Sequence, residues 1–133
     1  MVQTWLAMHQ PPITKEDRDI RDIIQENAKR LREIYPRFPF AGAYEAFFAQ
    51  YDALAFPGGL CASLDGIRQG DVKIIESALA FLEVKPYFHR SQYIRTRIIR
   101  LLKQATLSSL HAARFERVKE LEHKKKMQRK GYD

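Results

Sequence analysis

The residues best suited to chemistry lie between Lys85 and Lys103, where aromatic rings alternate with cationic side chains. Guanidinium forks match the geometry of carboxylates and phosphates, and neighbouring rings can stack on a bound group. In a helix, the later cations of this stretch share one face, opposite most of an apolar stripe. The pattern predicts a partner-binding site whose members are Arg90, Tyr93, Arg97, Arg100 and Lys103.

Two other interpretations of this stretch stay open. Exposed arginine is ordinary on a helix, so the cations can also form a solvated face, with Tyr87 and Phe88 packed inward. They can also pair with acidic residues of the N-terminal part of the chain, because arginine and carboxylate pair readily on protein surfaces. The charge of the segment would then stabilise the fold instead of recruiting a partner.

A second dense feature is a set of rings at helical spacing, formed by Tyr44, Phe47, Phe48 and Tyr51. Large rings at this spacing are typical of a helix face that packs into a core. A buried tyrosine hydroxyl needs a hydrogen-bond partner, so we expect Tyr44 and Tyr51 at the edge of the stripe. The alternative is a pocket or a stacking platform.

No catalytic, metal or cofactor motif stands out. The four histidines lie in separate segments without an HxxxH or HExxH pair, and Gly58-Gly59 lacks the Lys-Ser/Thr of a P-loop. Cys61 stands among small apolar residues, which favours a quiet packed thiol. We therefore expect no metal and no cofactor, and the sequence implies no small-molecule ligand. The residues favour a non-catalytic protein over an enzyme, and both classes stay open.

Amphipathic stripes and helix breakers divide the chain into helical segments. Thr14 is placed to cap the first helix and Asp71 the fourth. The fifth helix begins at Ser91 or a neighbour, and Ser108 or Ser109 is placed to cap the last. Proline or glycine follows most of the stripes, and no stretch alternates with period two as a strand would. The expected helices span about residues 14–35, 41–56, 60–68, 72–85, 91–105 and 109–121.

These segments predict an all-α fold of five to six amphipathic helices, in a compact bundle or as two stacked α-hairpins, with a basic C-terminal tail. A faint echo supports the hairpins, because a helix end, a proline, an aromatic residue and a new helix recur in 31–44 and 82–93. Ile24, Phe47 and Leu101 lie at the centres of three stripes and are predicted core residues. We expect an N-terminal extension over 1–13, one helical domain over 14–123 and a frayed tail over 124–133.

Charge and composition narrow the class of protein. A length of 133 residues fits one domain, and a single cysteine excludes an internal disulfide. No apolar run is long enough to span a membrane, so we expect a cytoplasmic protein. Residues 1–84 hold 9 Lys and Arg against 12 Asp and Glu, whereas residues 85–133 hold 14 against 4.

This asymmetry suggests an acidic partner for the C-terminal half. We predict a protein–protein interaction module that binds another protein or a second copy of itself. The alternative is a nucleic-acid-binding protein that uses the basic C-terminal half. The acidic N-terminal part argues against a surface that faces DNA uniformly, which is why the protein-binding interpretation ranks first.

Overall fold

The structure is a computed structural model that describes residues 15–38 and 41–129, and within these ranges the chain is all-α. It forms α2 (Lys15–Ile34), α3 (Ala43–Ala55), α4 (Leu60–Gln69), α5 (Val72–Val84), α6 (Ser91–Gln104) and α7 (Ser109–Arg129). The described residues contain no strand, which confirms the predicted fold class. The predicted N-terminal extension over 1–13 and the predicted Thr14 cap lie outside the described residues.

Local chemistry explains where several helices begin and end. The Asp71 carboxylate accepts from the backbone N–H of Ile74 at 3.2 Å and so caps α5, as predicted. Ser108 is the residue that caps α7, because its hydroxyl accepts from the N–H of His111 at 3.2 Å. Before α6 the N-cap position is Arg90, the neighbour of Ser91, with a left-handed φ of 67° and no capping side chain.

Two glycines explain why α4 forms although glycine weakens a helix. Gly66 is buried within α4, and a Cβ placed there would come within 2.2 Å of the Ile74 side chain, so glycine lets α5 approach. Gly70 ends the helix with a φ of 79°, a left-handed conformation that glycine adopts without strain. Both positions therefore serve the packing of α4 on α5.

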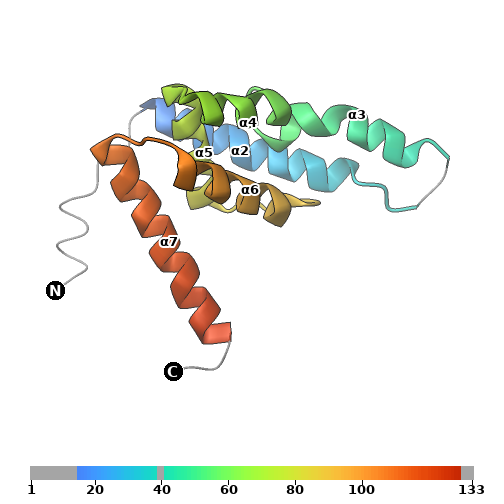
Figure 1. The fold of residues 1–133 in the computed structure, drawn as a ribbon. Helices are drawn as coiled ribbons and strands as arrows, with labels where there is room; N and C mark the ends of the chain where they lie inside the picture. Colours follow the sequence, from blue (N-terminus) through green and yellow to red (C-terminus); the bar gives the residue numbers. More distant parts are fainter. Residues whose placement is uncertain (1–14, 39–40, 130–133) are drawn as a thin grey trace.

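The helices form a bundle centred on α5, which contacts α2, α4, α6 and α7 (Figure 1). The run Ala78–Leu82 within α5 is buried at every position. A helix that is apolar all round belongs in a core, whereas a helix with one apolar stripe belongs at its edge. This run therefore makes α5 the central element around which the others pack.

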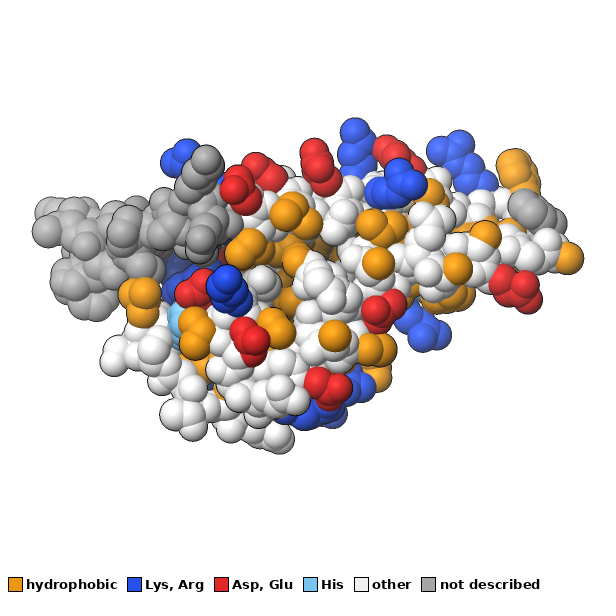
Figure 2. Space-filling model, turned by 90° about the horizontal axis from the view of Figure 1, so that it is seen from above, with side chains coloured by type: hydrophobic (Ala, Val, Ile, Leu, Met, Phe, Trp, Pro, Cys, Tyr) orange, Lys and Arg blue, Asp and Glu red, His pale blue; other side chains and the backbone are white. Residues whose placement is uncertain are grey.

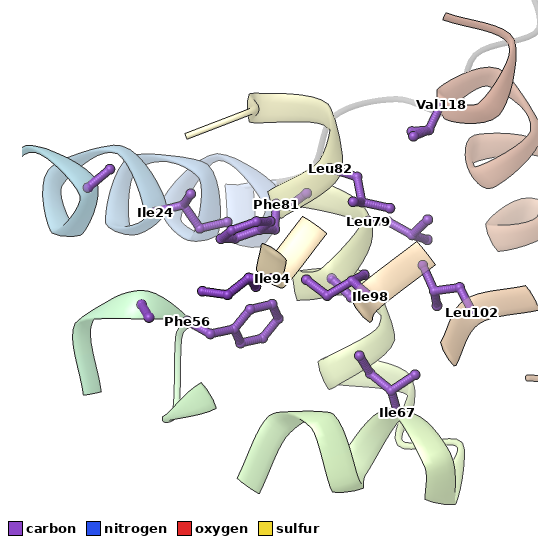
Figure 3. Packing of buried hydrophobic residues seen from close by; sticks show 14 of the residues in the cluster. Ile24, Phe56, Ile67, Leu79, Phe81, Leu82, Ile94, Ile98, Leu102 and Val118 are labelled. Atoms are coloured by element: carbon purple, nitrogen blue, oxygen red, sulfur yellow. The ribbon is translucent and has the colours of Figure 1, made fainter. Parts of the chain in front are cut away.

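The core draws side chains from every described helix, as Figure 3 shows for the labelled residues. Ile94 of α6 lies between the ring of Phe81 in α5 and that of Phe56, the C-cap residue of α3 (Figure 3). Burying a side chain of this size stabilises the fold by about 1.5–3 kcal/mol. The fully buried large side chains are Leu31, Phe47, Phe56, Ile67, Leu79, Phe81, Leu82, Ile94, Ile98 and Leu102.

Three core predictions have different outcomes. Ile24 and Phe47 are buried, with 3% and 1% exposure, as predicted. Leu101 is only partly buried, because α6 is rotated so that Ile98 and Leu102 take the deepest positions. The expectation that Tyr87 packs inward is wrong, since this ring is 77% exposed, whereas Phe88 is buried.

Helix α7 leaves the bundle at an angle and packs on it through its first half (Figure 1). His111, Phe115 and Val118 are buried, whereas residues 123–128 are exposed. The frayed segment expected after residue 123 differs from the structure, because helical hydrogen bonding continues to Arg129. Successive lysines and glutamates are good helix formers, so the helix outlasts its apolar stripe.

Candidate partner-binding surface

The five residues of the predicted site share helix α6 or its N-cap, and four of them are exposed. Tyr93 is 60% exposed, and Arg90, Arg100 and Lys103 are exposed as well. Arg97 is half-buried. Because Ile94, Ile98 and Leu102 occupy the core side of the helix, the geometry leaves the cations on the opposite side.

Hydrogen bonds from two other helices hold the segment that precedes α6. Arg32 of α2 donates from Nη1 to the Tyr87 carbonyl at 2.6 Å, and the Tyr51 hydroxyl of α3 donates to the His89 carbonyl at 2.7 Å. Burial raises the pKa of Tyr51 to about 12, with the nearby Arg90 charge acting against that shift, so the hydroxyl keeps the proton that it donates. The start of α6 is thus fixed relative to α2 and α3.

Tyr93 and Arg97 form a pair one turn apart on the exposed side of α6. Nη1 of Arg97 donates to the Tyr93 hydroxyl at 3.3 Å, and the guanidinium carbon lies 6.0 Å from the ring centroid. The hydrogen bond and the charge of Arg97 lower the pKa of Tyr93. The pair presents an arginine beside an exposed ring, a combination that is enriched at protein interfaces.

The aromatic stripe of α3 is partly core and partly surface. Phe47 is buried, Tyr51 is half-buried, and Tyr44 and Phe48 are 40% and 44% exposed, so the tyrosines lie at the edge as expected. The His89 ring lies among the aromatic rings, with its centroid 5.0 Å from that of Tyr35 and 5.9 Å from that of Phe48. The stripe therefore continues across His89 to the start of α6.

These residues define one exposed region, which we call the aromatic–arginine surface. Phe48 contacts His89, the Arg90 charge acts on the Tyr93 hydroxyl, and Arg97 lies against the Tyr93 ring. The predicted site is thus extended by the exposed rings of Tyr44 and Phe48 on α3, which belong to the stripe that the sequence predicted to be a core face. Its members are Tyr44, Phe48, His89, Arg90, Tyr93 and Arg97.

The ion pairs of the described residues use cations outside the predicted site. Arg21 and Arg114 both bind Glu83, with Nη2–Oε1 distances of 2.9 and 2.6 Å. Arg95 binds Glu122, and its Nη1 also donates to the Leu82 carbonyl at 2.8 Å. Arg90, Arg97, Arg100 and Lys103 form no ion pair with the acidic residues described, so internal pairing of the basic half involves Arg95 and Arg114 instead.

Arg95 belongs to the cationic stretch between Lys85 and Lys103, but unlike its exposed neighbours it is buried, which the spacing of cations did not predict. Its side chain is only 7% exposed. One signal was present, because Arg95 precedes Leu102 by two turns and therefore shares the direction of that core residue. The partner Glu122 lies on α7, and no spacing rule connects the two.

Acidic residues border the aromatic–arginine surface on the side of α4. Asp52 accepts from the backbone N–H of Cys61 at 2.9 Å. The hydrogen bond and charge of Asp52, with a smaller contribution from Asp65, raise the pKa of the Cys61 thiol, while the Arg97 charge opposes this. Cys61 is exposed and not packed as expected.

Both signs of charge appear on the face formed by α3 and α4, where hydrophobic side chains lie between acidic and basic ones (Figure 2).

Among the described residues, no group of three histidine, cysteine or acidic side chains is placed to hold a metal ion. No helix in those ranges is long and apolar enough to cross a membrane. Comparison of the chain with protein-family models, curated proteins and solved structures gave no match.

Proposed function

We propose that this chain is a non-catalytic protein-binding module that uses the aromatic–arginine surface to bind an acidic segment of a partner protein. The observation that carries the proposal is the pairing of exposed rings with arginines that lack a carboxylate partner among the described residues. Tyrosine and arginine account for much of the binding energy at protein interfaces. A partner carboxylate would satisfy the guanidinium fork, and apolar partner atoms would cover the rings.

The surface is also positioned in advance, which favours binding. The carbonyl groups before α6 are already held by Arg32 and Tyr51, so the N-terminal turn of the helix needs no ordering when a partner arrives. Preorganised binding surfaces lose less conformational entropy on association. The conformational entropy still lost on binding is that of the exposed side chains.

Mixed charge is the reason to prefer a protein to a nucleic acid. Asp52 and Asp65 lie beside the surface and would repel a continuous phosphate backbone. A folded or extended protein segment can place its own cations near these carboxylates. The exposed cations Arg100 and Lys103 then flank the interface and increase the rate of association.

Fluorescence anisotropy with two labelled probes tests the proposal. One probe is an acidic peptide that contains apolar residues, and the other is single-stranded DNA of equal charge. We expect Tyr93→Ala and Arg97→Gln each to weaken peptide binding by about 2 kcal/mol, or roughly thirtyfold. The matched control is Arg30→Gln, because Arg30 is an exposed arginine on α2, and it should bind like the parent.

The DNA probe separates the two classes of partner. Tighter binding of DNA than of the peptide, with a steep loss as salt rises, would contradict the proposal and support phosphate recognition. Equal losses in Arg97→Gln and Arg30→Gln would show that net charge alone attracts the peptide.

A further inference from the structure

A cavity lies on another side of α6, away from the aromatic–arginine surface. It has a volume of about 640 Å³ and is bounded by the end of α5, the first turns of α6 and the last turns of α7. Cavities of this size accept small organic molecules. The lining residues used below are Lys85, Tyr87, Gln92, Arg95, Glu122 and Lys125.

The base of the cavity is a fixed ion pair. Arg95 donates three hydrogen bonds, two to Glu122 Oε1, with Nε at 2.7 Å, and one from Nη1 to the Leu82 carbonyl at 2.8 Å. Its side chain is 7% exposed, so the guanidinium does not reorient freely. Glu122 belongs to α7, and the ion pair therefore holds α7 at the wall of the cavity.

Two lysines face each other at the rim. The close approach of the Lys125 ammonium group, together with burial, lowers the pKa of Lys85 to about 8. Lys85 leaves α5 with a left-handed φ of 55°, and its N–H bonds to the Phe81 carbonyl at 3.1 Å. This backbone conformation is strained for a residue other than glycine.

The cavity therefore carries an excess of positive charge. Lys85, Arg95 and Lys125 line it, and Glu122 is the only acidic side chain among its lining residues in the described part of the chain. Like charges held together disfavour the folded state unless an anion lies between them. Gln92 adds amide donors, and the exposed Tyr87 ring adds an apolar wall.

We infer that this cavity is a binding site for a small organic anion, whose phosphate or carboxylate group lies between Lys85 and Lys125 and whose apolar part lies against Tyr87. Lysine ammonium groups bind phosphate oxygens as point charges, and the Gln92 amide adds neutral donors. The inference is independent of the proposed function, because it uses none of the six residues of the aromatic–arginine surface.

Calorimetric titration with phenyl phosphate, inorganic phosphate and benzoate tests the site at constant ionic strength. We expect phenyl phosphate to bind more tightly than inorganic phosphate, since only the former has a ring to place against Tyr87. Comparison with benzoate identifies whether phosphate or carboxylate is the preferred group. Equal binding of phenyl phosphate and inorganic phosphate would overturn the assignment of an organic ligand.

Charge-matched variants locate the binding. Lys85→Gln and Lys125→Gln should each weaken phenyl phosphate binding by about tenfold or more, because each removes a charged hydrogen bond. Lys124→Gln removes the same charge from an exposed neighbour that does not line the cavity, and it should bind like the parent. An equal loss in Lys124→Gln, or no binding by the parent, would overturn the inference.

Amide NMR spectra of the same variants distinguish loss of the site from loss of the fold. If Lys85→Gln keeps the parent spectrum outside the cavity and fails to bind, the lysine acts on the ligand directly. If Lys85→Gln binds phenyl phosphate like the parent, the inference fails.

Discussion

Replacing Arg95 by methionine is the sharpest test of how α6 and α7 are held together. Methionine keeps the length and helix propensity of the arginine stem but removes its charge and its three donors. Arg97→Met makes the same chemical change two residues away, at a side chain that bonds only to the Tyr93 hydroxyl among the interactions described. The two variants differ in where the arginine lies.

The expected cost of Arg95→Met follows from its lost partners. The Leu82 carbonyl lies in the core and loses its side-chain donor, which costs about 1–3 kcal/mol. Glu122 is 31% exposed and can turn toward water, so loss of its ion pair with Arg95 contributes at most about 1 kcal/mol more. A total of about 1–4 kcal/mol lowers Tm by roughly 4–16 °C for a domain of this size. Arg97→Met should change the free energy of unfolding by about 0.5 kcal/mol or less.

Chemical denaturation with a double-mutant cycle measures the pair itself. Arg95→Met, Glu122→Met and the double variant should show a coupling free energy of up to about 1 kcal/mol, because both single changes remove the same contact. Additive effects would mean that Glu122 does not bind Arg95 in solution. If Arg97→Met were the more destabilising variant, the rotation of α6 about its axis would be wrong.

Three further predictions concern the core, the C-terminal helix and pH. Ile24→Asp and Phe47→Asp should each lower the free energy of unfolding by several kcal/mol in urea denaturation. Leu101→Asp should lower it less because Leu101 is only partly buried, and equal losses in the three variants would contradict the burial pattern. Deleting residues 124–133 should leave Tm nearly unchanged, because residues 124–128 are exposed, and a large fall would show that this segment packs on the bundle. Because the pKa of Lys85 is lowered to about 8, repulsion from Lys125 is fully present below about pH 8 and is relieved between about pH 8 and the usual lysine value of 10.5. The stability of the parent should therefore rise across that window relative to that of Lys125→Gln, as measured in parallel thermal melts.

Sequence periodicity was sufficient for the helices because each one carries its own signals. Pro36, Asp71 and Gly70 act on the backbone within a few residues of their own position, so the ends that they set can be inferred without a tertiary structure. The stripe of α2 similarly identifies Ile24 as core from spacing alone. Local rules failed at α7, where apolar spacing ends near Leu121 but helix propensity does not.

The parts of the site that escaped prediction depend on contacts between distant segments. The exposed edge of the α3 stripe meets the segment before α6 at His89, and the rings of Phe48 and His89 are 41 positions apart in the chain. Lys85 itself adopts a left-handed conformation at the end of α5, and lysine has no propensity from which this could be predicted. Both features arise from how the helices pack, which periodicity does not encode.

The charge asymmetry of the chain resolves into separate groups once the partners are known. Arg95 and Arg114 are bound by Glu122 and Glu83 and stabilise the packing of α7, so they add little field outside the molecule. The exposed cations of α6 keep their charge available, beside rings that make the surface selective. Lys85 and Lys125 form a third group, whose mutual repulsion is relieved by an anion or by deprotonation. An acidic protein segment and a small anion would therefore bind at different sides of α6, and Arg97→Gln and Lys85→Gln should each weaken one interaction and preserve the other.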